Sequence, residues 1–150
     1  MTRLPRLAIA TLALLAACAA DSPSSPPVTP DIALDTLITG MSHPLFVTAP
    51  PGDRSRLFVV ERTGQIRIFR NGALLATPFL DITSEVNTGA EQGVLGMAFP
   101  PDYATSRDFV VYYVDPSLNT VLSRFHVPAG TPDVADPASE DTLLTIAQPV

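Results

Sequence analysis

The sequence contains no lysine, so arginine supplies all nine basic residues, against fifteen aspartates and glutamates. The formal net charge is −6, and removal of the first residues with Arg3 and Arg6 would make the remainder still more acidic. Binding to nucleic acid depends on clustered basic side chains that neutralise phosphates, and electrostatic docking on an anionic membrane needs similar clusters. The composition therefore argues against both kinds of partner.

Cysteine is almost absent as well: Cys18 is the only one, so no disulfide can form within the chain. It follows a positively charged start and an uncharged apolar run from Leu7 to Ala17, the layout of a secretory signal. This run is shorter than the roughly 20 apolar residues of a membrane-spanning helix. The residues Leu15-Ala16-Ala17-Cys18 resemble the lipobox of bacterial lipoproteins, in which the cysteine becomes the N-terminus and carries the lipid.

We therefore expect an exported lipoprotein of the cell envelope, in the periplasm or at the outer membrane, with a lipid on Cys18 as its only membrane anchor. A plain signal peptide with an incidental cysteine is the alternative. Residues 21–30 hold four prolines among serines and cannot bury a core, which is typical of an extended tether. The expected organisation is a signal peptide over 1–17, a tether over 18–35 and a folded region over 36–150.

Helical periodicity is missing from the folded region, whose patterns are those of β-strands. Arg56 to Glu61 is apolar, β-branched and aromatic, whereas Gln65 to Arg70 alternates polar and apolar residues. Gly64 between them and Asn71-Gly72 after them predict tight turns. Further strands are predicted at Phe79–Ile82, Val94–Phe99, Asp108–Val114, Thr120–Val127 and Thr142–Ala147. Short strands in series predict an all-β sandwich, barrel or propeller, and their spacing alone does not choose among these.

A series of motifs resembles the N-terminal part of the glucose/sorbosone dehydrogenase family. The first three are Pro51-Gly52-Asp53-Arg54-Ser55-Arg56-Leu57-Phe58-Val59-Val60-Glu61, Gly64-Gln65-Ile66-Arg67-Ile68 and Pro78-Phe79-Leu80-Asp81-Ile82. The most specific is Glu91-Gln92-Gly93-Val94-Leu95-Gly96-Met97-Ala98-Phe99, and Pro101-Asp102-Tyr103 and Ser123-Arg124-Phe125 follow it. The resemblance covers roughly residues 38–148, and it depends on the order and spacing of all six pieces.

This family comprises soluble or lipid-anchored sugar dehydrogenases that depend on pyrroloquinoline quinone (PQQ). The resemblance implies that the all-β region is a partial six-bladed β-propeller, with two to three blades at about 40–50 residues each. It further implies an oxidoreductase that oxidises an aldose sugar at its anomeric carbon and passes hydride to the quinone, with calcium as a second cofactor.

Two departures from the family pattern bear on activity. Pro100 stands in Ala98-Phe99-Pro100-Pro101 where the family commonly has a histidine. The family's catalytic histidine lies in an Asn-His-Asn-Gly-Gly-like stretch after a Gln-Pro pair, and here Gln148-Pro149 is followed only by Val150. The family's quinone contacts and calcium ligands come later still. We therefore assign no catalytic residue and no metal ligand, and expect an N-terminal piece that is inactive as truncated.

Glu91 and Gln92 are the candidate residues of a substrate or cofactor pocket. In the family this loop lies near the central pocket, and Gly89 and Gly93 let the backbone turn sharply there. The alternative is that the loop merely leads the chain into the strand beginning at Val94. The glycine spacing is not a phosphate-binding loop, because no Lys-Ser or Lys-Thr pair follows.

Other polar residues favour structural roles. His43 and His126 lie far apart in the sequence and have no paired spacing, which argues against a zinc site. Asp102 and Asp115 adjoin prolines, a context typical of turns rather than of a calcium loop. A non-catalytic β-propeller that binds ligands at the cell surface is the alternative function, since one fold serves many roles.

Overall fold

The computed structural model describes residues 32–89 and 91–148. The compact unit Asp35–Val150 contains the strands. Cys18, the signal peptide and most of the expected tether lie outside the described residues. Within the part of the chain that is described, no helix is long and apolar enough to cross a membrane.

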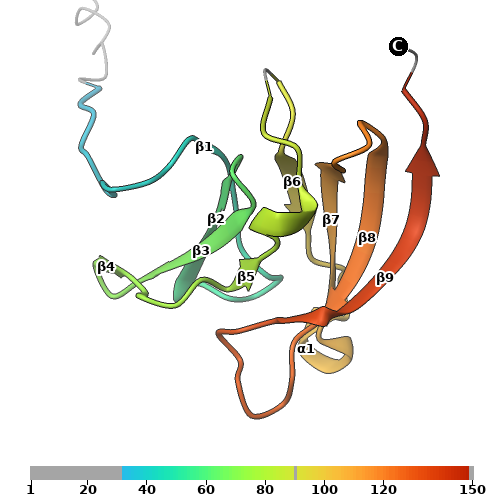
Figure 1. Cartoon of the computed structure of the whole chain (residues 1–150). Helices are drawn as coiled ribbons and strands as arrows, with labels where there is room; N and C mark the ends of the chain where they lie inside the picture. The colour runs from blue at the N-terminus through green and yellow to red at the C-terminus, as the bar shows by residue number, and fades with distance from the viewer. Residues whose placement is uncertain (1–31, 90, 149–150) are drawn as a thin grey trace, which may run out of the picture. The chain divides into compact units, whose positions relative to one another are not determined.

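The folded unit consists of two antiparallel sheets (Figure 1). Sheet A contains five strands: β1 (Pro44–Thr48), β2 (Arg56–Glu61), β3 (Gln65–Arg70), β4 (Ala73–Leu74) and β5 (Leu80–Asp81). Sheet B follows in chain order with β6 (Val94–Ala98), β7 (Asp108–Val114), β8 (Thr120–His126) and β9 (Asp136–Ile146). The only helices in the described ranges are the short η1 (Thr83–Glu85) and α1 (Tyr103–Ser106). The all-β prediction is confirmed.

An aromatic core lies between the two sheets. Phe58 of β2 packs edge-on against Phe79 with ring centroids 4.7 Å apart, and Phe79 lies 4.9 Å from Phe109 of β7. These three rings are fully buried. They join β2 to β7 across the sequence, and burying each ring contributes about 1.5–3 kcal/mol to folding. The two sheets therefore share one hydrophobic core.

The predicted hairpins are present with small changes at the strand ends. Asn71 and Gly72 both have positive φ angles, 53° and 80°, as a primed turn requires. The pattern missed β1, because Pro44 opens it and its side chains are mostly exposed, so backbone pairing with β2 rather than burial defines this strand. The last strand begins at Asp136 rather than at Thr142. Its first six residues include Pro137 and three acidic residues, which break the apolar pattern expected of a strand.

Each sheet has two ends, which carry different loops. At one end the turn 62–64, the segments 82–89 and 91–93 and the turn 115–119 come together, and we call it the Glu91 end. At the other end lie the loop 49–55, the segment 99–107 with α1 and the loop 127–135, and we call it the Arg107 end. Strand β6 runs between the two ends beside β1 and β2 (Figure 1).

Candidate functional site

The predicted pocket loop at the Glu91 end is fixed by backbone hydrogen bonds. The Val94 amide donates to the Arg62 carbonyl at 3.0 Å, and the Val114 amide donates to the Gly93 carbonyl at 3.0 Å. These two bonds tie the loop to the turn after β2 and to the end of β7. The entry to β6 is therefore held by both sheets.

Gly93 is the position where this approach requires glycine. Its φ angle is +124°, and a Cβ atom added there would lie 2.1 Å from the Arg62 carbonyl oxygen. No side chain fits so close to a backbone atom, and other residues rarely adopt this φ. The glycine in the Glu91-Gln92-Gly93 motif thus has a local structural reason, which the sequence interpretation attributed only to a sharp turn.

Glu91 and Gln92 precede this glycine and differ in their surroundings. Glu91 is exposed, and its carboxylate makes no hydrogen bond or ion pair with the residues that the structure describes. Gln92 is half-buried, and its backbone amide donates to the Gly89 carbonyl at 2.7 Å. A Cβ on Gly89 would lie 3.0 Å from the Gln92 Oε1 atom, so the amide group rests on the loop itself. Two neighbouring residues thus offer different groups: Glu91 a carboxylate exposed to solvent, and Gln92 an amide held against the loop.

A buried carboxylate, Glu61, lies at the same end and was not singled out from the sequence. It ends β2, is 2% exposed, and accepts a hydrogen bond from the Ser42 backbone amide at 2.6 Å. A buried carboxylate is costly unless it is hydrogen-bonded. Its place at the end of the apolar run Leu57–Val60 is the signal that could have identified it, because an acidic residue continuing such a run is unusual in a core.

Two further carboxylates and a tyrosine form a cluster near the Glu91 end. The Tyr113 hydroxyl donates to Glu140 Oε1 at 2.6 Å. Burial raises the pKa of Glu85, and so do its hydrogen bond and like-charge interaction with Glu140. The pKa of Tyr113 is raised by burial and then by its bond to Glu140. Glu85 therefore keeps its proton to a higher pH than an ordinary glutamate does.

The residues expected to be structural make local contacts. Asp115 accepts from the Asn119 backbone amide at 2.8 Å and so closes the turn between β7 and β8. His126 contacts Asp108 across the β7–β8 pair, Nδ1 to Oδ1 at 2.7 Å, and both side chains are substantially exposed. The Nδ1 atom of His43 lies 3.3 Å from the Ser42 hydroxyl. Among the described residues, no group of three or more His, Cys, Asp or Glu side chains could hold a metal ion.

The fold is shared with solved sugar dehydrogenases. The PQQ-bound aldose sugar dehydrogenase from Streptomyces coelicolor has a TM-score of 0.61 and 24% sequence identity, over 75% of this chain and 33% of that one. A glucose dehydrogenase gives a TM-score of 0.62 at 19% identity, over 74% of this chain and 34% of that one. At such identities the similarity concerns the fold.

The sequence itself is similar to a vertebrate protein. It is 29% identical over 87 residues to mouse Hedgehog-interacting protein, which is 55% of this chain and 12% of that protein. The sequence matches no model of a protein family. The chain thus spans a small part of this relative and about a third of the dehydrogenases. The chain has an all-β fold that matches part of a dehydrogenase β-propeller, which decides among the architectures that the strand spacing left open.

Proposed function

We propose that this chain forms the opening blades of a PQQ-dependent dehydrogenase that oxidises aldose sugars. The observation that carries the proposal is the fold match to the PQQ-bound aldose sugar dehydrogenase over 75% of the chain. The six motifs that resemble the glucose/sorbosone dehydrogenase family also support it. Sugar is then the substrate and PQQ the cofactor.

In this proposal Glu91 and Gln92 contribute to the pocket for sugar or quinone. The exposed Glu91 carboxylate accepts hydrogen bonds from sugar hydroxyls, and the Gln92 amide can both donate and accept. The backbone hydrogen bonds of Gly93 with Val114 and of Val94 with Arg62 fix the direction from which these groups approach a ligand. The quinone, when bound, supplies the redox chemistry, while these residues bind and orient the substrate.

The described residues do not fit a calcium site. Calcium takes six to eight oxygen ligands, and no three carboxylates or histidines come together in residues 32–89 and 91–148. We therefore assign no step to calcium in this part of the molecule. Glu91 and Gln92 offer hydrogen-bonding groups for a polar organic ligand, so they fit a sugar or quinone better than a cation.

Exposed apolar side chains on two strands support the propeller assignment. On β1, Phe46 and Val47 are 41% and 53% exposed, and on β9, Leu144 and Ile146 are 50% and 47% exposed. In repeat architectures neighbouring units cover such side chains. These strands would therefore contact further blades, and an isolated two-sheet protein would leave them in water.

A dye-linked assay tests the proposal. Aldose oxidation is measured with PQQ and calcium, both for the 150-residue chain and for the product that includes any residues the gene encodes after Val150. We expect no dye reduction above background by the 150-residue chain, because the family's catalytic histidine has no counterpart in it, and turnover by the longer product. Absence of turnover in a folded longer product with PQQ would contradict the proposal.

The Glu91→Gln variant of the longer product tests the pocket assignment. It should lower kcat/KM about 10-fold or more, since one charged hydrogen-bonding group is lost. The Asp136→Asn variant removes an equal charge from an exposed residue at the start of β9 and should leave kcat/KM unchanged. Equal effects of the two variants would place Glu91 outside the pocket.

A non-catalytic binding module is the second candidate function. The similarity to mouse Hedgehog-interacting protein favours it, because that protein is named for an interaction rather than a reaction. This candidate predicts saturable binding of a protein ligand without aldose oxidation. The residues encoded after Val150 discriminate the two, since an Asn-His-x-Gly-Gly stretch there would favour the dehydrogenase.

We further propose export and lipid attachment at Cys18, which rest on the sequence alone. Mass spectrometry of the mature protein should find Cys18 first and bearing diacylglycerol. Cys18→Ser should move the protein from the membrane fraction to the soluble fraction, because the lipid is its anchor. An intact Met1, or an unmodified Cys18 at the mature N-terminus, would contradict lipidation.

A further inference from the structure

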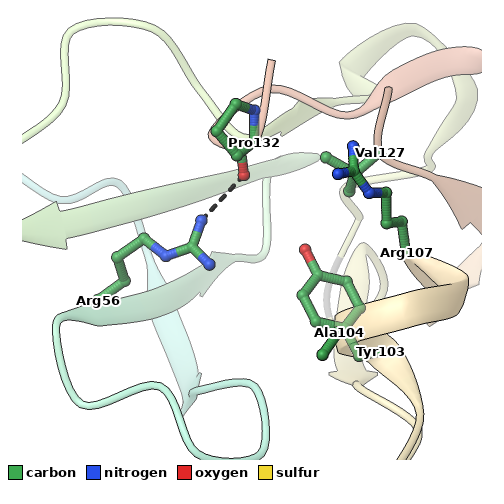
Figure 2. Close-up of a pocket in the computed structure, with 6 residues that line it drawn as sticks. All are labelled: Arg56, Tyr103, Ala104, Arg107, Val127 and Pro132. Atoms are coloured by element: carbon green, nitrogen blue, oxygen red, sulfur yellow. Dashed lines mark hydrogen bonds between the residues drawn. The ribbon is translucent and has the colours of Figure 1, made fainter. Parts of the chain in front are cut away.

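A cavity at the Arg107 end is lined by an arginine whose guanidinium has no partner among the described residues. The cavity has a volume of about 180 Å³ and is lined by Arg56, Tyr103, Ala104, Arg107, Val127 and Pro132. Figure 2 shows the guanidinium group of Arg107 and the hydroxyl group of Tyr103 directed into the same space. The cavity thus combines polar hydrogen-bond donors with an apolar wall.

The Arg107 guanidinium makes no hydrogen bond or ion pair with the residues that the structure describes, and its Nη1 atom is buried. Leaving a buried donor without an acceptor is unfavourable, and more so when the donor is charged. Its backbone is held at both sides: the Arg107 amide donates to the Tyr103 carbonyl at 2.9 Å, and the Arg107 carbonyl accepts from the Val127 amide at 3.0 Å. The backbone of Arg107 is therefore fixed, and its guanidinium group is available to donate hydrogen bonds to an acceptor.

The other charges around the cavity balance each other. Arg56 contacts Asp53 at 2.6 Å and Asp133 at 2.9 Å, and Arg70 contacts Asp133 at 2.7 Å. Arg56 also donates to the Pro132 carbonyl at 2.9 Å (Figure 2). Two arginines and two aspartates thus neutralise one another. Arg107 adds one uncompensated positive charge, which suits a ligand with a single negative charge.

We propose that this cavity binds a small monocarboxylate with an apolar body. Its carboxylate oxygens would accept hydrogen bonds from the Arg107 guanidinium and the Tyr103 hydroxyl, and its apolar part would contact Ala104, Val127 and Pro132. Arginine matches a carboxylate with two parallel bonds. A cavity of about 150 Å³ can hold a benzene ring, so benzoate has a suitable size. The proposal is independent of the dehydrogenase assignment, because it concerns the opposite end of the sheets from Glu91.

Calorimetric titration of the purified protein with benzoate at constant ionic strength tests the site. We expect saturable binding of one benzoate, and weaker or no binding of neutral benzamide and of inorganic phosphate. Arg107→Gln should weaken benzoate binding about 10- to 100-fold, and Tyr103→Phe about 3- to 10-fold, from the loss of charged and neutral hydrogen bonds respectively. Arg54→Gln removes the same charge from an exposed side chain outside the cavity and should leave binding unchanged.

A second variant keeps the test valid if Arg107→Gln does not fold. Ala104 is exposed on α1 and lines the cavity, so Ala104→Leu should fill the space and block benzoate while Arg107 remains. Near-ultraviolet circular dichroism reports the fold of each variant. The proposal is overturned if benzoate fails to bind, which would leave water as the partner of Arg107. It is also overturned if benzamide binds equally well, or if Arg54→Gln weakens binding as much as Arg107→Gln.

Discussion

The two ends of the folded unit hold their polar groups in different ways. The Glu91 end gathers carboxylates and fixes its loops mainly through backbone hydrogen bonds, as between Val94 and Arg62. The Arg107 end adds ion pairs of arginine with aspartate, as between Arg56 and Asp133, to the backbone hydrogen bond between Val127 and Arg107. Backbone bonds tolerate changes of charge but not of shape, whereas ion pairs tolerate small changes of shape but not of charge. The difference predicts that mutations of opposite kinds will damage the two ends.

The largest effect is expected from a change of shape at the Glu91 end. Gly93→Ala would place a Cβ atom 2.1 Å from the Arg62 carbonyl oxygen, on a residue with φ of +124°. The backbone must shift and break the bonds to both sheets, so we expect a loss of at least about 3 kcal/mol in the free energy of unfolding. Denaturant unfolding monitored by circular dichroism measures it.

Gly72→Ala is the matched control for this prediction. Gly72 also has a positive φ, +80°, but a Cβ there would meet nothing within 4 Å. Only the conformational cost remains, which is about 1–2 kcal/mol. If both variants lost the same stability, close packing of Gly93 against Arg62 would not explain the glycine.

A loss of charge should have the larger consequence at the Arg107 end. Asp133→Asn removes the negative partner that Arg56 and Arg70 share, while Arg56 keeps its contact with Asp53. Because these side chains are only partly exposed, we expect a loss of about 1–2 kcal/mol in the free energy of unfolding. Asp141→Asn breaks the more exposed ion pair with Arg124 and should cost about 0–1 kcal/mol.

Thermal and denaturant unfolding of these two aspartate variants at low and high salt distinguish the loss of a specific ion pair from a general effect of net charge. The Asp133 contribution should persist at high salt better than that of Asp141, since partly buried pairs are screened less. An Asp133→Asn variant as stable as the unsubstituted protein would show that ion pairs do not hold the loop 127–135 against β2.

Local patterns predicted the strands better than the contacts between them. The ranges Arg56–Glu61, Gln65–Arg70 and Asp108–Val114 were predicted with the observed bounds, because burial and β-propensity act within a few residues. The contact of Gly93 with Arg62 and the ion pair of Arg56 with Asp133 join residues far apart in the sequence. No periodicity encodes such pairs, so only the folded arrangement identifies them.

The sequence likewise predicted the loop of the candidate site but not the contacts around it. The motif around Glu91 indicated a loop before a strand, and that loop is present. The buried Glu61 and the pairing of Glu85 with Glu140 were not predicted. Each depends on a strand from elsewhere in the chain that covers an otherwise ordinary glutamate. The unpaired Arg107 likewise looks like any surface arginine until α1 and the loop 127–135 enclose it.

The smallest expected effect is the change of the free energy of unfolding with pH. Its sign should be opposite at the two ends. Burial opposes the charged form of Asp53, but its hydrogen bonds with Ser55 and Arg56 outweigh this, so its pKa is lowered from 3.8. A lowered pKa in the folded state means that Asp53 stabilises the fold above its ordinary value, and that this stability is lost as the pH falls through the folded value. The Arg107 end should therefore weaken in acid.

Glu85 behaves in the opposite way, because burial and its contact with Glu140 raise its pKa above the ordinary 4.5. Its contribution is complete below pH 4.5 and is lost as the pH rises through the folded value, where two charged carboxylates must lie together. Glu85→Gln keeps a neutral hydrogen-bonding group and should stabilise the protein near neutral pH, by less than the losses above. Unfolding free energies measured from pH 2 to 8 should show a flatter decline above pH 4.5 in this variant, while Asp53→Asn should flatten the loss below pH 3.8. A Glu85→Gln variant with an unchanged pH profile would show that the pKa of Glu85 is not raised in the folded protein. The contrast between the two ends would then rest on shape and ion pairing alone.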